Sequence, residues 1–221
     1  GGSTNHTLHL IAIAKAAGIK LTWQDFSDLA SVIPLITRIY PNGPADVNHF
    51  HAAGGMAFVI YTLLENGLLH EDVNTILGKG LRNYTKDPKL DEKNINYVDG
   101  PVQSLNEKII RSAQSPFDKT GGLKVLIGNI GTAIIKTSAV DPSHHTVEAQ
   151  AIVFDDQDDL IKQFKADALN RDFIAVLPFQ GPKYKGMPEL HKLTPTLTIL
   201  QKRGYKVGLI TDGRMSGASG K

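Results

Sequence analysis

The sequence predicts a mixed α/β fold, in which a helix-rich first part is followed by a β-rich second part. Three observations lead to this prediction: helix caps and helically spaced apolar residues fill the first eighty positions, polar residues punctuate 81–120, and short β-branched runs begin at Gly121. Because 41% of the 221 residues are hydrophobic, the chain can build a real core. We therefore expect two separate cores joined by a linker.

Helix signals follow one another through the first part. Thr4 and Asn5 can accept hydrogen bonds from the first amides of a helix, and Gly18 can end it. Thr22, followed three residues later by Asp25, has the pattern of a capping box. The predicted helices cover residues 6–17, 22–29, 45–53, 55–65 and 72–77.

Residues 81–120 lack sustained periodicity, which is typical of a linker between domains. From Gly121 onward, β-branched runs alternate with Gly, Pro and Asp, as strands and turns do. The predicted strands cover residues 123–127, 132–135, 146–154, 173–177 and 207–210, and the predicted helices cover residues 155–166 and 194–203.

Charge and composition exclude several classes of function. Lys and Arg number 24 against 22 Asp and Glu, so the sequence predicts no nucleic-acid partner and no anionic membrane partner. No stretch approaches the 18 uninterrupted apolar residues of a membrane span. The lack of cysteine excludes a disulfide framework, and an iron–sulfur cluster held by these residues alone. The chain begins without Met and stops within a glycine-rich loop, from which we expect a fragment.

Four stretches place glycines beside short polar residues, so that backbone amides can approach a ligand and form an anion-binding nest. Each alone would fit an ordinary turn or helix cap. These stretches are Gly1–His6, Tyr40–Gly55, Gly181–Lys192 and Thr211–Gly220.

Taken together, these stretches resemble the dihydroxy-acid and 6-phosphogluconate dehydratase family over essentially the whole chain. Gly1–Asn5, followed by an apolar helix, is similar to the segment after the family's last cluster cysteine. Gly181–Leu190 is similar to its Gly-Pro…Met-Pro-Glu loop, and Asp212–Gly217 looks like its Asp-Gly-Arg-x-Ser-Gly catalytic loop. Arg38–Gly43 with Asn48–Phe50 resembles the phosphogluconate branch.

The resemblance implies an architecture of two incomplete domains. Residues 1–118 would be the end of a cluster-binding α/β domain with its linker. Residues 119–221 would begin a β-rich, barrel-like, swivelling domain that carries the catalytic loop. The resemblance also implies a cytoplasmic homodimer that acts on a small phosphorylated sugar acid, without nucleic-acid or membrane partners.

The family removes water from a 2,3-dihydroxy acid. The phosphogluconate branch implies 6-phosphogluconate as substrate and 2-dehydro-3-deoxy-6-phosphogluconate as product, in the Entner–Doudoroff pathway. A base must take the C2 proton while a cation stabilises the enolate, and a Lewis acid must take the C3 hydroxide. The resemblance assigns these tasks to a Mg²⁺-supported serine and to an iron–sulfur cluster. Neither cofactor is expected to be fully bound by this fragment, which we expect to be inactive alone.

Carried over residue by residue, Ser216 would be the base and Glu189 a Mg²⁺ ligand. The residues expected to bind substrate are Ser3, Thr4, Asn5, Asp212, Arg214 and Gly217. Other interpretations stay open at this point: Glu189 could stand in the first turn of a helix, Arg214 could brace its loop through Asp212, and Ser3, Thr4 and Asn5 could be simple caps.

Two further interpretations compete with this one. The enzyme could act on a branched-chain dihydroxy acid or an unphosphorylated aldonate, although basic side chains such as Lys185 suit a phosphate. The chain could also be a non-enzymatic domain that binds a phosphorylated ligand. We do not expect metal ligation by the histidine pairs, because His49 and His51 lie on different faces of a helix and His144 and His145 follow a turn.

Overall fold

The computed structural model describes residues 2–215. Contacts divide the chain into two compact units, one formed by residues 28–122 and the other by residues 1–27 together with 123–221. Each unit has its own hydrophobic core. The predicted domain boundary between residues 118 and 119 concerns the longer protein and stays a prediction.

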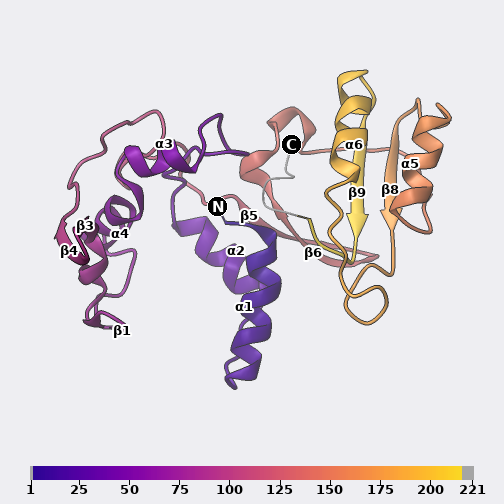
Figure 1. The fold of residues 1–221 in the computed structure, drawn as a ribbon. Helices are drawn as coiled ribbons and strands as arrows, with labels where there is room; N and C mark the ends of the chain where they lie inside the picture. Colours follow the sequence, from indigo (N-terminus) through magenta and orange to yellow (C-terminus); the bar gives the residue numbers. More distant parts are fainter. Residues whose placement is uncertain (1, 216–221) are drawn as a thin grey trace. The chain divides into compact units, whose positions relative to one another are not determined.

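The secondary structure is mixed α/β, which confirms the predicted class (Figure 1). The helices are α1 Thr4–Ala16, α2 Trp23–Val32, α3 Val47–Ala52, α4 Gly55–Glu65, α5 Gln157–Lys165 and α6 Leu193–Lys202, with 3-10 turns η1 Leu81–Thr85, η2 Thr137–Ala139 and η3 Pro142–His144. The strands are β1 Asn74–Thr75, β2 Gly78–Lys79, β3 Lys86–Asp91, β4 Asn94–Asp99, β5 Leu123–Gly128, β6 Gly131–Lys136, β7 Ala151–Val153, β8 Phe173–Leu177 and β9 Val207–Thr211. Within residues 2–215, no helix has the length and apolar content that crossing a membrane requires.

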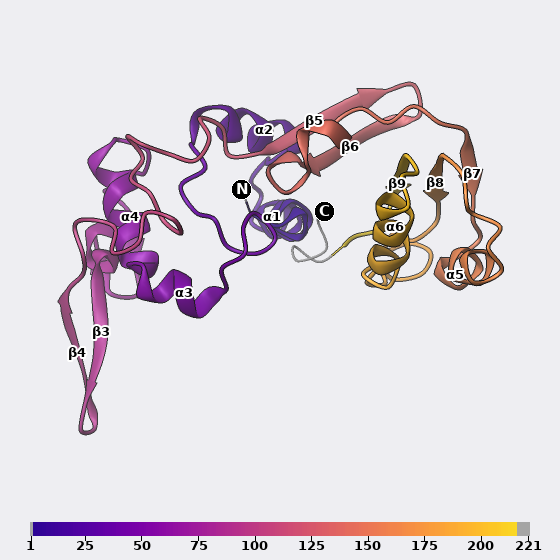
Figure 2. The same ribbon diagram turned by 90° about the horizontal axis from the view of Figure 1, so that it is seen from above.

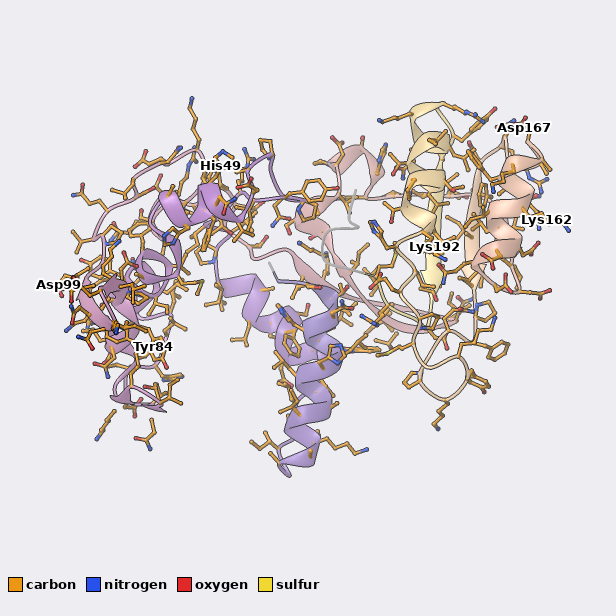
Figure 3. All side chains as sticks on the ribbon, viewed as in Figure 1. His49, Tyr84, Asp99, Lys162, Asp167 and Lys192 are labelled. Atoms are coloured by element: carbon orange, nitrogen blue, oxygen red, sulfur yellow. The ribbon has the colours of Figure 1, made fainter. Side chains whose placement is uncertain are left out.

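Reciprocal capping boxes start helices α2 and α3. Thr22 donates to Asp25 Oδ2 through both its amide and its hydroxyl, each at 2.7 Å, and the Asp25 amide returns a 3.4 Å hydrogen bond to Thr22 Oγ1. The predicted capping box at α2 is therefore confirmed. At α3, Asp46 and His49 form a second reciprocal box, so His49, labelled in Figure 3, acts as a helix cap.

Residues 28–122 depart from the prediction in two places. The predicted helix at 72–77 is wrong, because Thr75 and Gly78 instead pair across the short antiparallel β1–β2 ladder, with Gly78 at φ +103°. The stretch 81–120 was predicted as a linker between two cores, but it belongs to this unit, and its strands β3 and β4 form a six-pair antiparallel hairpin (Figure 2). Ile109 and Ile110, from the same stretch, are buried in the core of this unit.

The other unit contains a three-stranded parallel sheet in the order β7-β8-β9. Helices α5 and α6 lie on the same face of this sheet (Figure 2). Phe173, Ala175 and Leu177 of β8 are fully buried, and they pack with Leu160 and Leu200 in the core cluster. The predicted strand at 146–154 shrinks to three residues, because β7 pairs with β8 at only three positions.

The same unit also contains a hairpin, whose two strands match the strands predicted at 123–127 and 132–135. Strands β5 and β6 pair in antiparallel fashion from Leu123↔Lys136 to Gly128↔Gly131. Burial lowers the pKa of the Lys136 side chain at one end of this ladder. The hairpin does not belong to the parallel sheet, and it is not part of the site described next.

Candidate active site

The site lies at the carboxyl ends of the parallel strands. Because β8 and β9 run parallel, the chain leaves both strands at the same edge of the sheet, where the two arrowheads lie in Figure 1. The loop after β8 begins at Pro178 and the loop after β9 begins at Asp212. Open α/β sheets bind ligands at this edge, since loops from neighbouring strands converge there.

Asp212 joins the two loops through its carboxylate. The amides of Gln180 and Gly181 donate to Oδ1 at 2.8 Å and to Oδ2 at 3.2 Å. On the β9 side, the Thr211 hydroxyl donates to the Leu177 carbonyl at 2.8 Å and accepts from the Gly213 amide at 3.0 Å. Both Asp212 oxygens accept backbone hydrogen bonds and so hold the two loops together, while the predicted binding of substrate by Asp212 stays a prediction.

Two glycines allow this close approach. A Cβ at Gly213 would lie 2.8 Å from Gln180 Cβ and 3.0 Å from Leu190 Cδ1, both shorter than any ordinary contact. A Cβ at Gly181 would lie 3.0 Å from Asp212 Oδ2. Neither glycine has a positive φ, so both are needed for space and not for an unusual backbone conformation.

Arg214 and Glu189, both predicted site residues, are brought together. They face each other in an isolated parallel bridge, and the Leu190 amide donates to the Arg214 carbonyl at 3.2 Å. Arg214 Nη1 lies 3.5 Å from Glu189 Oε2, and Arg214 Nε donates to the Met187 carbonyl at 3.2 Å. The side chains are 29% and 37% exposed, so the ion pair is solvent-screened and both groups are accessible to a ligand.

These contacts decide two of the open interpretations. Glu189 is not in the first turn of a helix, because α6 begins only at Leu193. Arg214 does brace its loop, but through Met187 and Glu189, since the Asp212 carboxylate is occupied by backbone amides. These interactions join segments about thirty residues apart, and the sequence contains no local signal for them.

Backbone strain gathers in the loop after β8. Phe179 and Met187 have φ values of +61° and +59°, in the left-handed region that non-glycine residues avoid. Each such residue costs on the order of 1–3 kcal/mol and persists where surrounding contacts impose it, often at functional sites. Met187 follows Gly186, at φ +70°, and its carbonyl accepts the hydrogen bond from Arg214.

Ser3, Thr4 and Asn5 lie at the start of α1. Ser3 is the N-cap, and its Oγ accepts from the Asn5 amide at 3.2 Å. The Thr4 carbonyl accepts from the Thr7 hydroxyl at 2.6 Å. Asn5 Oδ1 is buried and has no partner within residues 2–215. The capping role is thus observed at Ser3, while substrate binding by these three residues stays a prediction.

The predicted base Ser216 and its neighbour Gly217 lie outside the described residues.

For the predicted cofactors, the available ligand atoms decide what the chain could hold. The chain has no cysteine, so its residues do not fit an iron–sulfur cluster. Glu189 offers the carboxylate oxygen that Mg²⁺ prefers, but within residues 2–215 no three His, Asp or Glu side chains gather as a metal site. The chain thus fits Mg²⁺ only as the source of one ligand.

Comparison with known proteins identifies the family. Residues 1–84 match the dihydroxy-acid/6-phosphogluconate dehydratase N-terminal profile, and residues 108–221 match the C-terminal profile of the same family. The chain belongs to the dihydroxy-acid/6-phosphogluconate dehydratase family.

The relatives divide by degree of identity. The whole chain is 59% identical to a phosphogluconate dehydratase of Pseudomonas aeruginosa and 54% identical to one of Escherichia coli, and it covers 36% and 37% of their lengths. Identity falls to 34%, over 99% of the chain and 37% of the relative, for a dihydroxy-acid dehydratase of Caldanaerobacter subterraneus. The chain therefore spans little more than a third of these relatives.

Proposed function

We propose that the protein containing this chain removes water from 6-phosphogluconate to give 2-dehydro-3-deoxy-6-phosphogluconate, the dehydration of the Entner–Doudoroff pathway. The supporting observation is the difference in identity: 54–59% to relatives named phosphogluconate dehydratase against 34% to one named dihydroxy-acid dehydratase, each over almost the whole chain. The proposal includes a cytoplasmic homodimer.

The reaction breaks the C2–H and C3–O bonds. In our proposal the Ser216 oxygen, as alkoxide, takes the C2 proton, the electron pair forms the C2–C3 double bond, and the C3 oxygen leaves as hydroxide. The resulting enol then tautomerises to the 2-keto acid. A serine hydroxyl ionises far above neutral pH, so positive charge must lower its pKa. Arg214, two residues before Ser216, is one source of such charge.

Glu189 is the residue of this chain that we assign to Mg²⁺, because its carboxylate is accessible and chemically suited to a hard cation. When bound, Mg²⁺ would supply positive charge that stabilises the enolate. The group that takes the C3 hydroxide is not assigned to a residue of this chain. We expect the 221-residue chain alone to be inactive, since it has no cysteine thiolate for a cluster and we assign only one of its carboxylates to Mg²⁺.

The test is an assay of the full-length protein on 6-phosphogluconate, gluconate and a branched-chain dihydroxy acid. We expect the highest kcat/KM on 6-phosphogluconate. Ser216→Ala should abolish both turnover and exchange of C2 deuterium with solvent while substrate binding is retained, and the control Ser115→Ala should behave as wild type. Glu189→Gln should be partly rescued by excess Mg²⁺. Near-normal exchange in Ser216→Ala would disprove the assignment of the base.

A further inference from the structure

A pocket adjoins the candidate site on the same edge of the sheet. It has a volume of about 290 Å³, and its walls come from the start of α5 (residues 156–158), from Gln180, Lys185 and Pro188 after β8, and from Lys192 before α6. Figure 3 labels Lys192 at the end of the sheet toward which β8 and β9 run. The pocket is continuous with the site, because the Gln180 amide contacts Asp212 and Pro188 precedes Glu189.

Two ammonium groups border this pocket. Lys185 Nζ donates to the Asp155 carbonyl at 3.2 Å, which tethers that side chain to the loop after β7. Neither Lys185 nor Lys192 forms an ion pair with a carboxylate in the described part of the chain. The carboxylates of Asp156 and Asp158 also line the pocket, but neither pairs with Lys185 or Lys192 within residues 2–215, and Asp156 Oδ1 accepts from the Asp159 amide at 2.9 Å as the N-cap of α5. The lysines therefore keep their charge available for an anion.

Gln157 provides a second, independent observation. Its Oε1 is buried and has no hydrogen-bond partner within residues 2–215. A buried acceptor left without a donor costs on the order of 1–3 kcal/mol, so a ligand hydroxyl that reaches it would recover that energy. All residues of the lining except Pro188 are polar. An aliphatic ligand would leave these groups without partners and would be rejected for that reason.

We propose that this pocket binds the end of the substrate that is remote from the reacting carbons. Lys185 and Lys192 pair with its phosphate, and Gln157 Oε1 accepts a hydrogen bond from a hydroxyl group of the carbon chain. The inference rests on the proposed function and adds to it the part of the molecule that selects a phosphorylated polyhydroxy acid over an aliphatic or unphosphorylated one. No residue of this pocket takes part in the bond-breaking steps.

The experiment measures substrate preference in the full-length protein, as the ratio of kcat/KM for 6-phosphogluconate to that for gluconate. Lys185→Met and Lys192→Met remove the charge and keep an unbranched, flexible stem. Each should lower the ratio by about 10-fold or more, the loss expected for a charge-assisted hydrogen bond. The matched control is Lys162→Met on α5, which is exposed and outside the pocket and should keep the wild-type ratio.

The possible results separate the two proposals. If the wild-type protein does not dehydrate 6-phosphogluconate, the proposed function is wrong. If it does, and both lysine variants retain the wild-type ratio, the function stands and the pocket is not the phosphate site. A wild-type protein that uses gluconate as efficiently as 6-phosphogluconate would also overturn the pocket assignment. Both lysines are exposed, so these substitutions leave the buried core of the unit intact.

Discussion

The close contact at Gly213 predicts a specific cost for Gly213→Ala. The new Cβ would stand 2.8 Å from Gln180 Cβ and 3.0 Å from Leu190 Cδ1, so the two loops must move apart. Overpacking of this kind costs about 1–3 kcal/mol. Replacing glycine by alanine also lowers the conformational entropy of the unfolded chain. This raises the free energy of unfolding by about 0.4–1 kcal/mol wherever the backbone conformation allows alanine.

Gly128→Ala is the matched control for this measurement. Gly128 has no positive φ, and its Cβ would meet nothing within 4 Å, so this variant gains the unfolded-state term without the clash. The two variants should therefore differ by the overpacking cost alone. Hydrogen exchange of the Gln180 and Gly181 amides in the full-length protein should be about 5-fold to 100-fold faster in Gly213→Ala than in Gly128→Ala. Equal exchange rates would show that the loops after β8 and β9 are not packed as described.

Three other substitutions or conditions test the remaining parts of the fold. Asp212→Asn replaces an acceptor with an amide donor that faces a backbone N–H, so it should destabilise the loop by about 1–3 kcal/mol and speed exchange at the same two amides. Leu200→Ala, at a fully buried position, should lower the free energy of unfolding by about 2–5 kcal/mol in urea denaturation, whereas Ile199→Ala, 40% exposed, should cost far less. The Thr22 hydroxyl and amide lower the pKa of Asp25, so the cap of α2 should be fully effective above the ordinary value of 3.8 and be lost as pH falls through the lower folded value, which an NMR titration of Asp25 would follow.

Short-range signals in the sequence predicted much of the fold. The capping box of Thr22 with Asp25, which spans only four residues, marks the start of α2. The β-branched runs at 123–127 and 173–177 form strands, as predicted. The β3–β4 hairpin escaped prediction because its strands, Lys86–Asp91 and Asn94–Asp99, are mostly polar and exposed, and hence lack a buried face with regular apolar alternation.

Long-range contacts explain the rest. The motif of Asp212 and Arg214 was recognised from the sequence, but the roles of these residues in the structure depend on partners about thirty positions away. Gln180 was not singled out, because a buried Gln beside a Gly-Pro pair has no distinctive pattern, and Thr211 and Leu190 were included only as ends of the recognised stretches. Parallel strands separated by a helix bring such residues together, and that proximity becomes visible only when the sheet order is known.

The charges at this edge of the sheet suit a substrate that is anionic at both ends. Arg214 pairs with Glu189, while Lys185 and Lys192 border the adjoining pocket, which Gln180 also lines. A sugar acid phosphorylated at its far end has a carboxylate for the first group and a phosphate for the second. In this orientation, contacts at the lysines act equally on the bound substrate and on its transition state, so their loss should appear mainly in KM. Contacts near Arg214 lie closer to the atoms that change charge, so their loss should appear mainly in kcat.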